Sequence, residues 1–166
     1  MPLSFLLGIA YVCLAHPART SLLAGAIVLI PGLFVRGLAS GHVRKDRELT
    51  MSGPYAYTRN PLYLGSLIIA AGFALAARSI VILGLMVLMF VVIYVPVIAG
   101  EERYLRRTFA EYDDYARHVP RLWLRFTRYG DQHGAFSSDL YWKHREYNAT
   151  LGSMILLGVL LFKLML

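Results

Sequence analysis

Residues 79–100 read SIVILGLMVLMFVVIYVPVIAG and contain no charged residue. A helix that crosses a bilayer needs about 20 apolar residues, because the hydrocarbon core is about 30 Å thick. This stretch therefore predicts a membrane-spanning helix. The composition agrees, since 57% of the 166 residues are hydrophobic and only 16% are charged, whereas soluble domains carry about 25% charged residues. These values exclude an ordinary soluble enzyme domain, so any chemistry must come from membrane helices and the segments between them.

Four further apolar stretches predict the remaining membrane elements, at about 3–15, 20–39, 61–78 and 149–166. The first is short for a full span, and the last reaches span length if the Lys163 ammonium extends to the membrane interface. Only the turn at Arg78–Ser79 separates residues 61–78 from residues 79–100, so these two stretches form a helical hairpin. We therefore predict an all-α integral membrane bundle of about five membrane helices, as a single domain over residues 1–166.

The basic residues predict the orientation of this bundle. The chain has 17 Lys and Arg against 10 Asp and Glu, and most of the basic residues lie in the polar segments 40–60 and 101–148. Because Lys and Arg concentrate on the cytoplasmic side of membrane proteins, both segments and the N-terminus are expected to be cytoplasmic. A bacterial inner membrane is the expected location. The charge excess then favours membrane lipid as a partner and gives no support for nucleic acid.

The segment that follows residue 100 shows helical periodicity. Leu105, Phe109, Tyr112 and Ala116 recur at helical spacing, which predicts that residues 101–118 form an amphipathic cytoplasmic helix continuing from the membrane span. The 61–100 hairpin leaves one membrane face and returns to it, so its two ends should lie at one membrane depth. Tyr63 and Glu101 would come together there. Residues 130–148 are polar and contain several Gly and Ser residues, which predicts a loop.

Several common site motifs are missing from the sequence. The five histidines show no metal-ligand spacing and Cys13 is the only cysteine, so no metal site is predicted. Neither G-x-G-x-x-G nor a Walker A motif is present, which leaves a soluble Rossmann-type nucleotide site unsupported. Residues 117–129 read RHVPRLWLRFTRY, and their aromatic side chains beside arginines are typical of a membrane-surface segment.

Two separated motifs carry a resemblance to a known superfamily. R-N-P-L-Y-L-G at 59–65, followed by the apolar hairpin and Glu101-Glu102, resembles the R-H-P-x-Y-x-G … E-E pattern of the isoprenylcysteine carboxyl methyltransferase and phospholipid methyltransferase superfamily. The run E-E-R-Y-L…F-A-E-Y-D-D-Y…V-P-R looks like its continuation, so the resemblance covers about residues 40–124. Asn60 stands where histidine is usual, Ala110 where glycine is common, and Leu124 where proline often follows. The run at 41–49 is unlike the eukaryotic isoprenylcysteine enzymes, so prenylated protein is not the expected substrate.

The resemblance implies an integral membrane enzyme that uses S-adenosylmethionine without a Rossmann domain. As a hypothesis, Arg59 pairs with the cofactor carboxylate, and Glu101 or Glu102 takes the ammonium or the ribose hydroxyls. Tyr63 or another aromatic residue lies near the sulfonium. The expected cofactor-binding residues are Gly53, Tyr55, Arg59, Asn60, Pro61, Tyr63, Leu64, Gly65, Glu101, Glu102, Tyr112 and Tyr115. His42 and Glu102 are the candidate catalytic residues, with His42 as a base for an amine or thiol acceptor.

The resulting prediction is a methyltransferase that acts on a lipophilic or small hydrophobic acceptor at the cytoplasmic membrane face. The acceptor group stays open between a phospholipid amine, a thiol and a carboxylate. Two alternatives also stay open. One is an NADPH-dependent membrane sterol or steroid reductase, in which Arg103, Arg106 and Arg107 would bind the 2′-phosphate. The other is a non-catalytic helical membrane scaffold, which predicts no polar cavity at the cytoplasmic end of the hairpin.

Overall fold

The computed structural model describes residues 2–44 and 48–166, and the regular secondary structure in these residues is helical. The longer helices are α1 (Pro2–Leu14), α2 (Arg19–His42), α3 (Pro61–Ala77), α4 (Ile80–Met89), α5 (Val95–Thr108) and α8 (Tyr147–Met165). The π-helical turn η2 (Phe90–Tyr94) joins α4 to α5 without a break. The shorter elements are the 3₁₀ helix η1 (Gly53–Ala56), α6 (Tyr112–His118) and α7 (Ser138–Lys143). The all-α fold expected from the sequence is confirmed.

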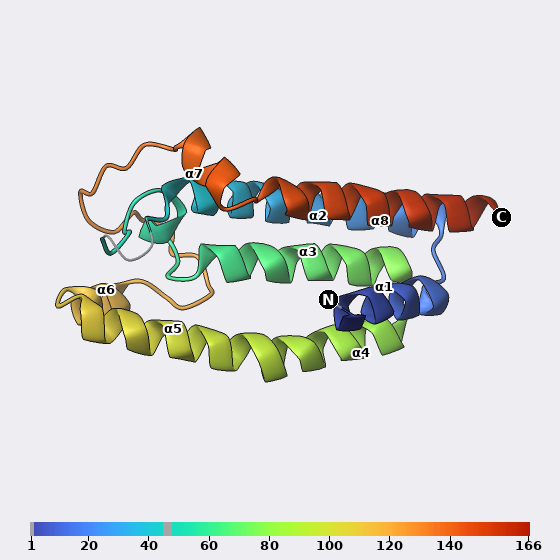
Figure 1. Cartoon of the computed structure of the whole chain (residues 1–166), viewed down its shortest axis with the longest axis horizontal. Coiled ribbons are helices and arrows are strands. Elements are labelled where there is room, and N and C mark those ends of the chain that lie inside the picture. The colour runs from blue at the N-terminus through green and yellow to red at the C-terminus, as the bar shows by residue number, and fades with distance from the viewer. Residues whose placement is uncertain (1, 45–47) are drawn as a thin grey trace.

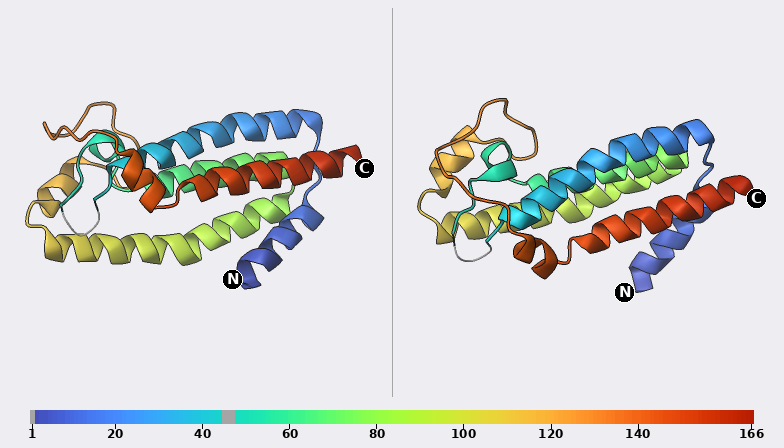
Figure 2. Two further views of the ribbon diagram at one scale, coloured as in Figure 1. Left: turned by 45° about the horizontal axis from the view of Figure 1, so that its top comes forward. Right: turned by 90° about the horizontal axis from the view of Figure 1, so that it is seen from above.

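The long helices run side by side, and the short elements gather at one end of the bundle (Figure 1). We call this the polar end; it holds η1, α6, α7 and the connecting segments. The views in Figure 2 show that α1 and the C-terminus of the chain lie at the opposite end. The molecule is therefore spanned from end to end by α2, α3, the continuous α4–α5 helix and α8.

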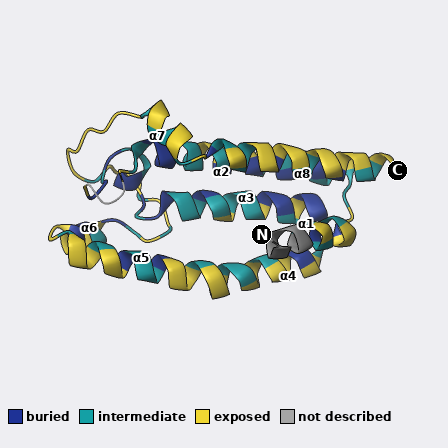
Figure 3. Ribbon diagram, viewed as in Figure 1, coloured by how far each residue is buried: buried dark blue, intermediate teal, exposed yellow. Residues whose placement is uncertain are grey.

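Among the described residues, three helices are long and apolar enough to cross a membrane: α2, the continuous helix Ile80–Thr108, and α8. Figure 3 shows that their outward faces are largely exposed, and large apolar side chains such as Ile27 and Phe34 are 68% and 65% exposed. Such apolar surface is stable only against lipid or another protein, so the chain is an integral membrane protein. Helix α3 is a shorter apolar helix of 17 residues, and α1, with 13 residues, is about 20 Å long, short of a full span.

Lys163 does not need to reach the membrane interface. Its ammonium donates hydrogen bonds to the carbonyl oxygens of Val12 at 2.6 Å, Cys13 at 3.2 Å and Ala15 at 2.8 Å. The last carbonyls of a helix lack intrahelical partners and carry the negative end of its dipole. The cation of α8 therefore caps the C-terminal end of α1, and this pairing explains why an apolar helix tolerates a lysine.

Two pairs of glycines bring α2 and α3 into close contact. A Cβ atom added at Gly25 would lie 2.5 Å from the carbonyl oxygen of Gly72, and one added at Gly32 would lie 2.9 Å from that of Gly65. The two pairs are seven residues apart on each antiparallel helix, so they lie on one face. Small residues allow the backbones of membrane helices to approach closely where the lipid gives no hydrophobic driving force for association.

The α3–α4 hairpin turns where the sequence predicts. Helix α3 ends at Ala77, Arg78 takes a left-handed conformation with φ of 49°, and the Ser79 side chain accepts a hydrogen bond from the Ile82 N–H. On the return path, Pro96 lacks an N–H donor and cannot complete a regular α-helical bond. The π-helical turn η2 lies directly before it, which accommodates the proline without ending the helix.

Two sequence-based predictions for the polar end are corrected. Residues 101–118 do not form one helix: α5 ends at Thr108, Phe109 adopts an extended conformation, and α6 begins at Tyr112. The break lets α6 fold back, so that Tyr112 is buried while Leu105, Phe109 and Ala116 pack around it in one cluster. The segment 130–148 is not wholly a loop, because it contains α7, where Ser137 accepts a hydrogen bond from the Leu140 N–H.

We expect the substitution Gly25→Ala to destabilise the protein, because the new methyl group would overlap the Gly72 carbonyl. The expected loss is about 1–3 kcal/mol, typical of overpacking in a close-packed interior. Gly84→Ala is the matched control, since a Cβ at Gly84 meets nothing within 4 Å. Thermal unfolding of the detergent-purified variants measures both. Equal melting temperatures for Gly25→Ala and Gly84→Ala would contradict the close α2–α3 contact.

Candidate active site

The polar end is held together by two segments that are far apart in the sequence. The Arg59 N–H donates to the Pro120 carbonyl at 2.9 Å, and the Arg125 N–H donates to the Tyr57 carbonyl at 3.0 Å. The Asn60 side-chain amide donates to the Arg121 carbonyl at 3.0 Å. The segment that precedes α3 is therefore bonded along its length to the segment that follows α6, and the motif residues 59–60 are fixed by this pairing.

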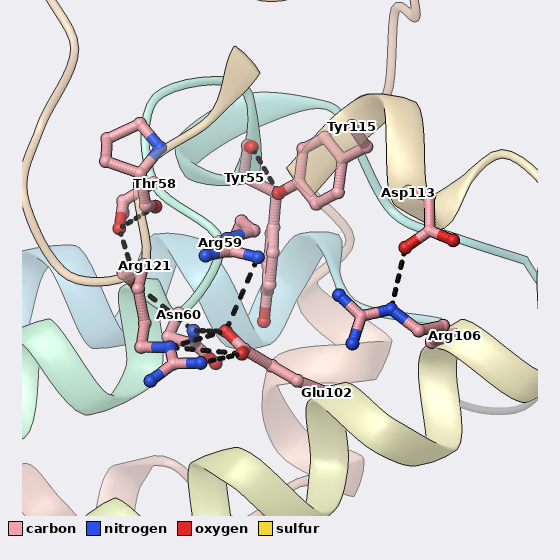
Figure 4. A network of polar contacts seen from close by, with 10 residues as sticks. Tyr55, Thr58, Arg59, Asn60, Glu102, Arg106, Asp113, Tyr115 and Arg121 are labelled. Atoms are coloured by element: carbon pink, nitrogen blue, oxygen red, sulfur yellow. Dashed lines mark hydrogen bonds and ion pairs between the residues drawn. The ribbon is translucent and has the colours of Figure 1, made fainter. Parts of the chain in front are cut away.

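Glu102 is the centre of the polar network drawn in Figure 4. Its carboxylate is buried, at 5% exposure, and accepts hydrogen bonds from Arg121 Nη2 at 2.6 Å and Asn60 Nδ2 at 3.1 Å. Arg59 Nη1 lies 3.8 Å from the same carboxylate. The hydrogen bonds to Glu102 raise the pKa of Arg121. A buried charge needs such partners, and they join α5 to the segments before α3 and after α6.

Glu101 and Tyr63 come together as the sequence predicts. The Tyr63 hydroxyl donates to Glu101 Oε2 at 2.9 Å, which links the start of α3 to α5. The Tyr63 ring packs edge-on against Tyr94, with 5.7 Å between centroids. Unlike Glu102, Glu101 is only half-buried and has no arginine within 4.0 Å among the residues that the structure describes. Its carboxylate therefore remains available to a cationic ligand.

A cavity of about 220 Å³ lies at the polar end beside these residues. Its charged lining consists of the acids Glu48 and Glu101 and the arginines Arg44 and Arg59. The aromatic lining consists of Tyr55, Tyr63, Tyr104, Phe109 and Tyr115. Burial raises the pKa of the Tyr115 hydroxyl, which stays protonated and donates to the Tyr55 carbonyl at 2.7 Å. The cavity thus combines charges of both signs with several aromatic surfaces in one hollow.

Six of the residues expected at the cofactor line this cavity: Tyr55, Arg59, Asn60, Tyr63, Glu101 and Tyr115. Glu102 and Tyr112 are buried in the walls behind it, where Glu102 holds the network and Tyr112 packs in the cluster of α6. Leu64 follows Tyr63 on α3 and does not line the cavity, and Gly65 packs against Gly32 and Arg36 of α2. Glu102 therefore positions neighbouring residues, and the catalytic role expected for it stays a prediction.

The structure does not bring His42 to the cavity. The His42 ring lines a separate open hollow of about 450 Å³, together with Gly53 and Pro61. Its Nδ1 atom lies 2.7 Å from the Leu38 carbonyl oxygen, and its ring packs edge-on against Phe136. These contacts favour a packing role for His42 and give no support for a base at the cavity.

Sequence reasoning missed several residues that complete this end of the molecule. Arg121 is the closest partner of Glu102, although the only sequence signal at that point is a run of basic and aromatic residues. Arg36 of α2 donates to both carboxylate oxygens of Glu146, at 2.5 and 3.0 Å, and to the Ser66 hydroxyl at 2.5 Å. A charge inside an apolar stretch is the signal that could have identified Arg36, because such a charge needs a partner in a membrane protein.

Comparison with known proteins finds similarity to one protein family and to two curated proteins. Residues 33–112 match the family model of phospholipid methyltransferases, which confirms the resemblance seen in the sequence. The chain is 37% identical over 84 residues to the nickel-cobalt-cadmium resistance protein NccN of Alcaligenes xylosoxydans xylosoxydans, which is 51% of this chain and 39% of that protein. It is 35% identical over 86 residues to the cobalt-zinc-cadmium resistance protein CzcN of Cupriavidus metallidurans, which is 52% of this chain and 40% of that protein. The chain thus matches about two fifths of the length of these curated relatives. No solved structure matches it.

The Glu102 network predicts a difference between two adjacent acids. We expect Glu102→Gln to lower the free energy of unfolding by about 2 kcal/mol, because it removes the charged partner of the Arg121 hydrogen bonds. Glu101→Gln should change stability much less, because glutamine still offers an oxygen to the Tyr63 hydroxyl. Thermal unfolding in detergent measures both variants. A larger loss for Glu101→Gln than for Glu102→Gln would contradict the assignment.

Proposed function

We propose that this chain, whose residues 33–112 match the family model of phospholipid methyltransferases, is a membrane methyltransferase that binds S-adenosylmethionine in the polar-end cavity. The main support for the proposal is that Arg59, Tyr63 and Glu101 all line that cavity. The Lys and Arg asymmetry of the sequence supports a cytoplasmic position for it.

Arg59 fits the carboxylate of this cofactor. Its side chain is 13% exposed, and its buried Nε atom has no hydrogen-bond partner among the residues that the structure describes. A buried donor without a partner is costly, and a ligand carboxylate would satisfy it with a charge-assisted bond. Arg44 offers a second guanidinium on the same lining.

The remaining lining fits the other groups of the cofactor. Glu101 and Glu48 supply negative charge for the ammonium, and the aromatic side chains supply a surface for the adenine and for the sulfonium. Tyr63 stands between Glu101 and Tyr94, held by a hydrogen bond to the first and by an edge-on ring contact with the second. Each part of the cofactor therefore has a complementary group within one hollow.

The bound cofactor would supply an activated methyl group, and this chain would position the two reactants and exclude water from them. Holding the acceptor in line with the methyl group can contribute up to roughly 7–11 kcal/mol to the lowering of the barrier. Tyr55 and Asn60, which line the cavity, are buried in the segment before α3, and this segment is bonded to the one after α6. Tyr63 and Glu101 hold one side of the site in a fixed geometry.

An apolar crevice supports a lipophilic acceptor. It measures about 290 Å³, lies between α3 and α4–η2, and is lined by small and apolar residues such as Leu67, Ala70 and Val87. Tyr94 lines the crevice and contacts Tyr63, which lines the cavity. An acyl chain in the crevice would therefore place its polar group beside the Tyr63 end of the cavity.

The two alternative functions receive less support. A scaffold would need no polar cavity at the end of the hairpin, yet one is present. In the reductase alternative, Arg103 and Arg106 line a different hollow from the cavity, and Arg107 lines neither. The names of the two relatives state resistance to metals. Our proposal for this chain is confined to the transfer chemistry of the shared region.

We expect Glu101→Gln to weaken binding of S-adenosylhomocysteine by about 1–3 kcal/mol, since a charge-assisted bond to the ammonium is lost. Isothermal titration of the detergent-purified protein measures the affinity. Glu111→Gln is the control, because Glu111 is exposed and does not line the cavity. An unchanged affinity for Glu101→Gln would remove this carboxylate from the site, and binding of NADPH in place of S-adenosylhomocysteine would favour the reductase.

We expect Ala70→Phe to fill the crevice and to lower methyl transfer to a lipid acceptor. Misplacement of a reacting group can cost about 100-fold in rate, whereas the cavity and its affinity for S-adenosylhomocysteine should stay unchanged. The assay follows transfer of a labelled methyl group to a total lipid extract, with identification of the product. Leu88→Phe, on the exposed face of α4, should retain full activity. Equal activity of the two variants would contradict this route for the acceptor.

A further inference from the structure

A second polar hollow, about 660 Å³, opens between α5 and α6 and shares only Arg59 with the cavity. We call it the arginine cleft. Its lining contains five arginines and two acids, which are Arg59, Arg103, Arg106, Arg117, Arg121, Glu102 and Asp113. The excess of three positive charges makes the cleft attractive to an anion, and guanidinium groups are well suited to bind phosphate.

Three of the five arginines have an acidic partner within the protein. Arg59 lies 3.8 Å from Glu102, and the other two lie closer to their acids. Arg106 Nε lies 2.6 Å from Asp113, and Arg121 Nη2 lies 2.6 Å from Glu102. Arg103 and Arg117 differ from them, because neither has an acid within 4.0 Å among residues 2–44 and 48–166. These two guanidinium groups approach one hollow from two different helices, α5 and α6. They are therefore available to a ligand that enters between the helices.

The cleft continues into an apolar surface. Pro96, Ala99, Arg103 and Arg106 all line it, and their spacing of three, four and three residues places them on one face of α5. The first two belong to the apolar part of the membrane-spanning helix and the last two to its charged end. One side of α5 therefore presents an apolar strip in the membrane and a cationic site at the membrane surface. A phospholipid has the matching arrangement, with its acyl chains in the membrane and its phosphate at the surface.

The depth of the cleft also matches a lipid headgroup. Trp123 follows Arg121 by two residues and is 83% exposed, and Phe126 is fully exposed beyond it. Exposed aromatic residues next to a membrane helix mark the interface, where headgroups lie. A phosphate in the cleft would sit at this level, so a lipid reaches it without leaving the bilayer.

From these observations we propose that the arginine cleft is a binding site for an anionic phospholipid, separate from the site of the methyl acceptor. The lipid phosphate lies between Arg103 and Arg117, and an acyl chain follows Pro96 and Ala99 along α5. The net positive charge of the cleft selects a headgroup that is negative overall against one that is zwitterionic. The bound lipid joins α5 to α6 through the phosphate.

The test compares lipid binding to two charge-matched variants of the full chain. Native mass spectrometry of the detergent-purified protein measures binding of palmitoyl-oleoyl phosphatidylglycerol and of phosphatidylcholine with the same acyl chains. The double variant Arg103→Gln with Arg117→Gln removes the two available arginines. Arg107→Gln with Lys143→Gln removes the same charge from exposed positions that do not line the cleft. No methyl donor is present, so the result is independent of methyl transfer.

We expect the unaltered protein to prefer phosphatidylglycerol, the cleft variant to bind it about tenfold or more weakly, and the control to keep the preference. Equal losses in both variants would overturn the proposal in favour of diffuse surface charge, as would full binding by the cleft variant. Inorganic phosphate that stabilises the protein as strongly as phosphatidylglycerol would show a site for free phosphate instead. Displacement of the lipid by S-adenosylhomocysteine would assign the cleft to the cofactor. Both variants are exposed substitutions, and equal melting temperatures without lipid confirm that they fold.

Discussion

The polar end depends on the neutralisation of one buried carboxylate. Glu102 lies at the end of a membrane-spanning helix with 5% exposure, and burial of an unpaired charge there would be prohibitive. Arg121 and Asn60 bind it directly, and Arg59 stands at 3.8 Å. These partners come from two segments that do not adjoin α5 in the sequence. Satisfying the carboxylate therefore brings both segments onto the helix end, and the cavity lies beside them, between the segment before α3 and the end of α5.

The membrane helices provide the frame for that arrangement. The glycine pairs let α2 and α3 lie close together, and Arg36 joins α2 to Ser66 of α3 and to Glu146 at the start of α8. These contacts hold α2 and α3 together near the polar end, where residues 53–60 lead directly into α3. The polar site at the end of the apolar bundle therefore depends on close packing between the membrane helices and on the ion pairs around the site.

Three hollows meet around the ends of α3 and α5, and their chemistry differs. The cavity has both charges and aromatic surfaces, the crevice between α3 and α4 is apolar, and the arginine cleft is cationic. Tyr63 and Tyr94 separate the first two, and Arg59 and the Glu102 network separate the first from the third. A methyl donor, a lipophilic acceptor and an anionic lipid could therefore be held side by side without competing for the same groups.

The sequence by itself determined the membrane class, the hairpin with its turn at Arg78–Ser79, and the meeting of Tyr63 with Glu101. Uncharged runs fix where helices can cross lipid, and helix length then fixes which residues share a depth. The motif also indicated six lining residues of the cavity. The tertiary structure alone decided the break between α5 and α6, the different environments of Glu101 and Glu102, the distance of His42 from the cavity, and the pairings of Arg121, Arg36 and Lys163. Helical periodicity continues across a break such as Phe109–Glu111, and the partner of a charge is chosen by packing between distant segments, which no local pattern encodes.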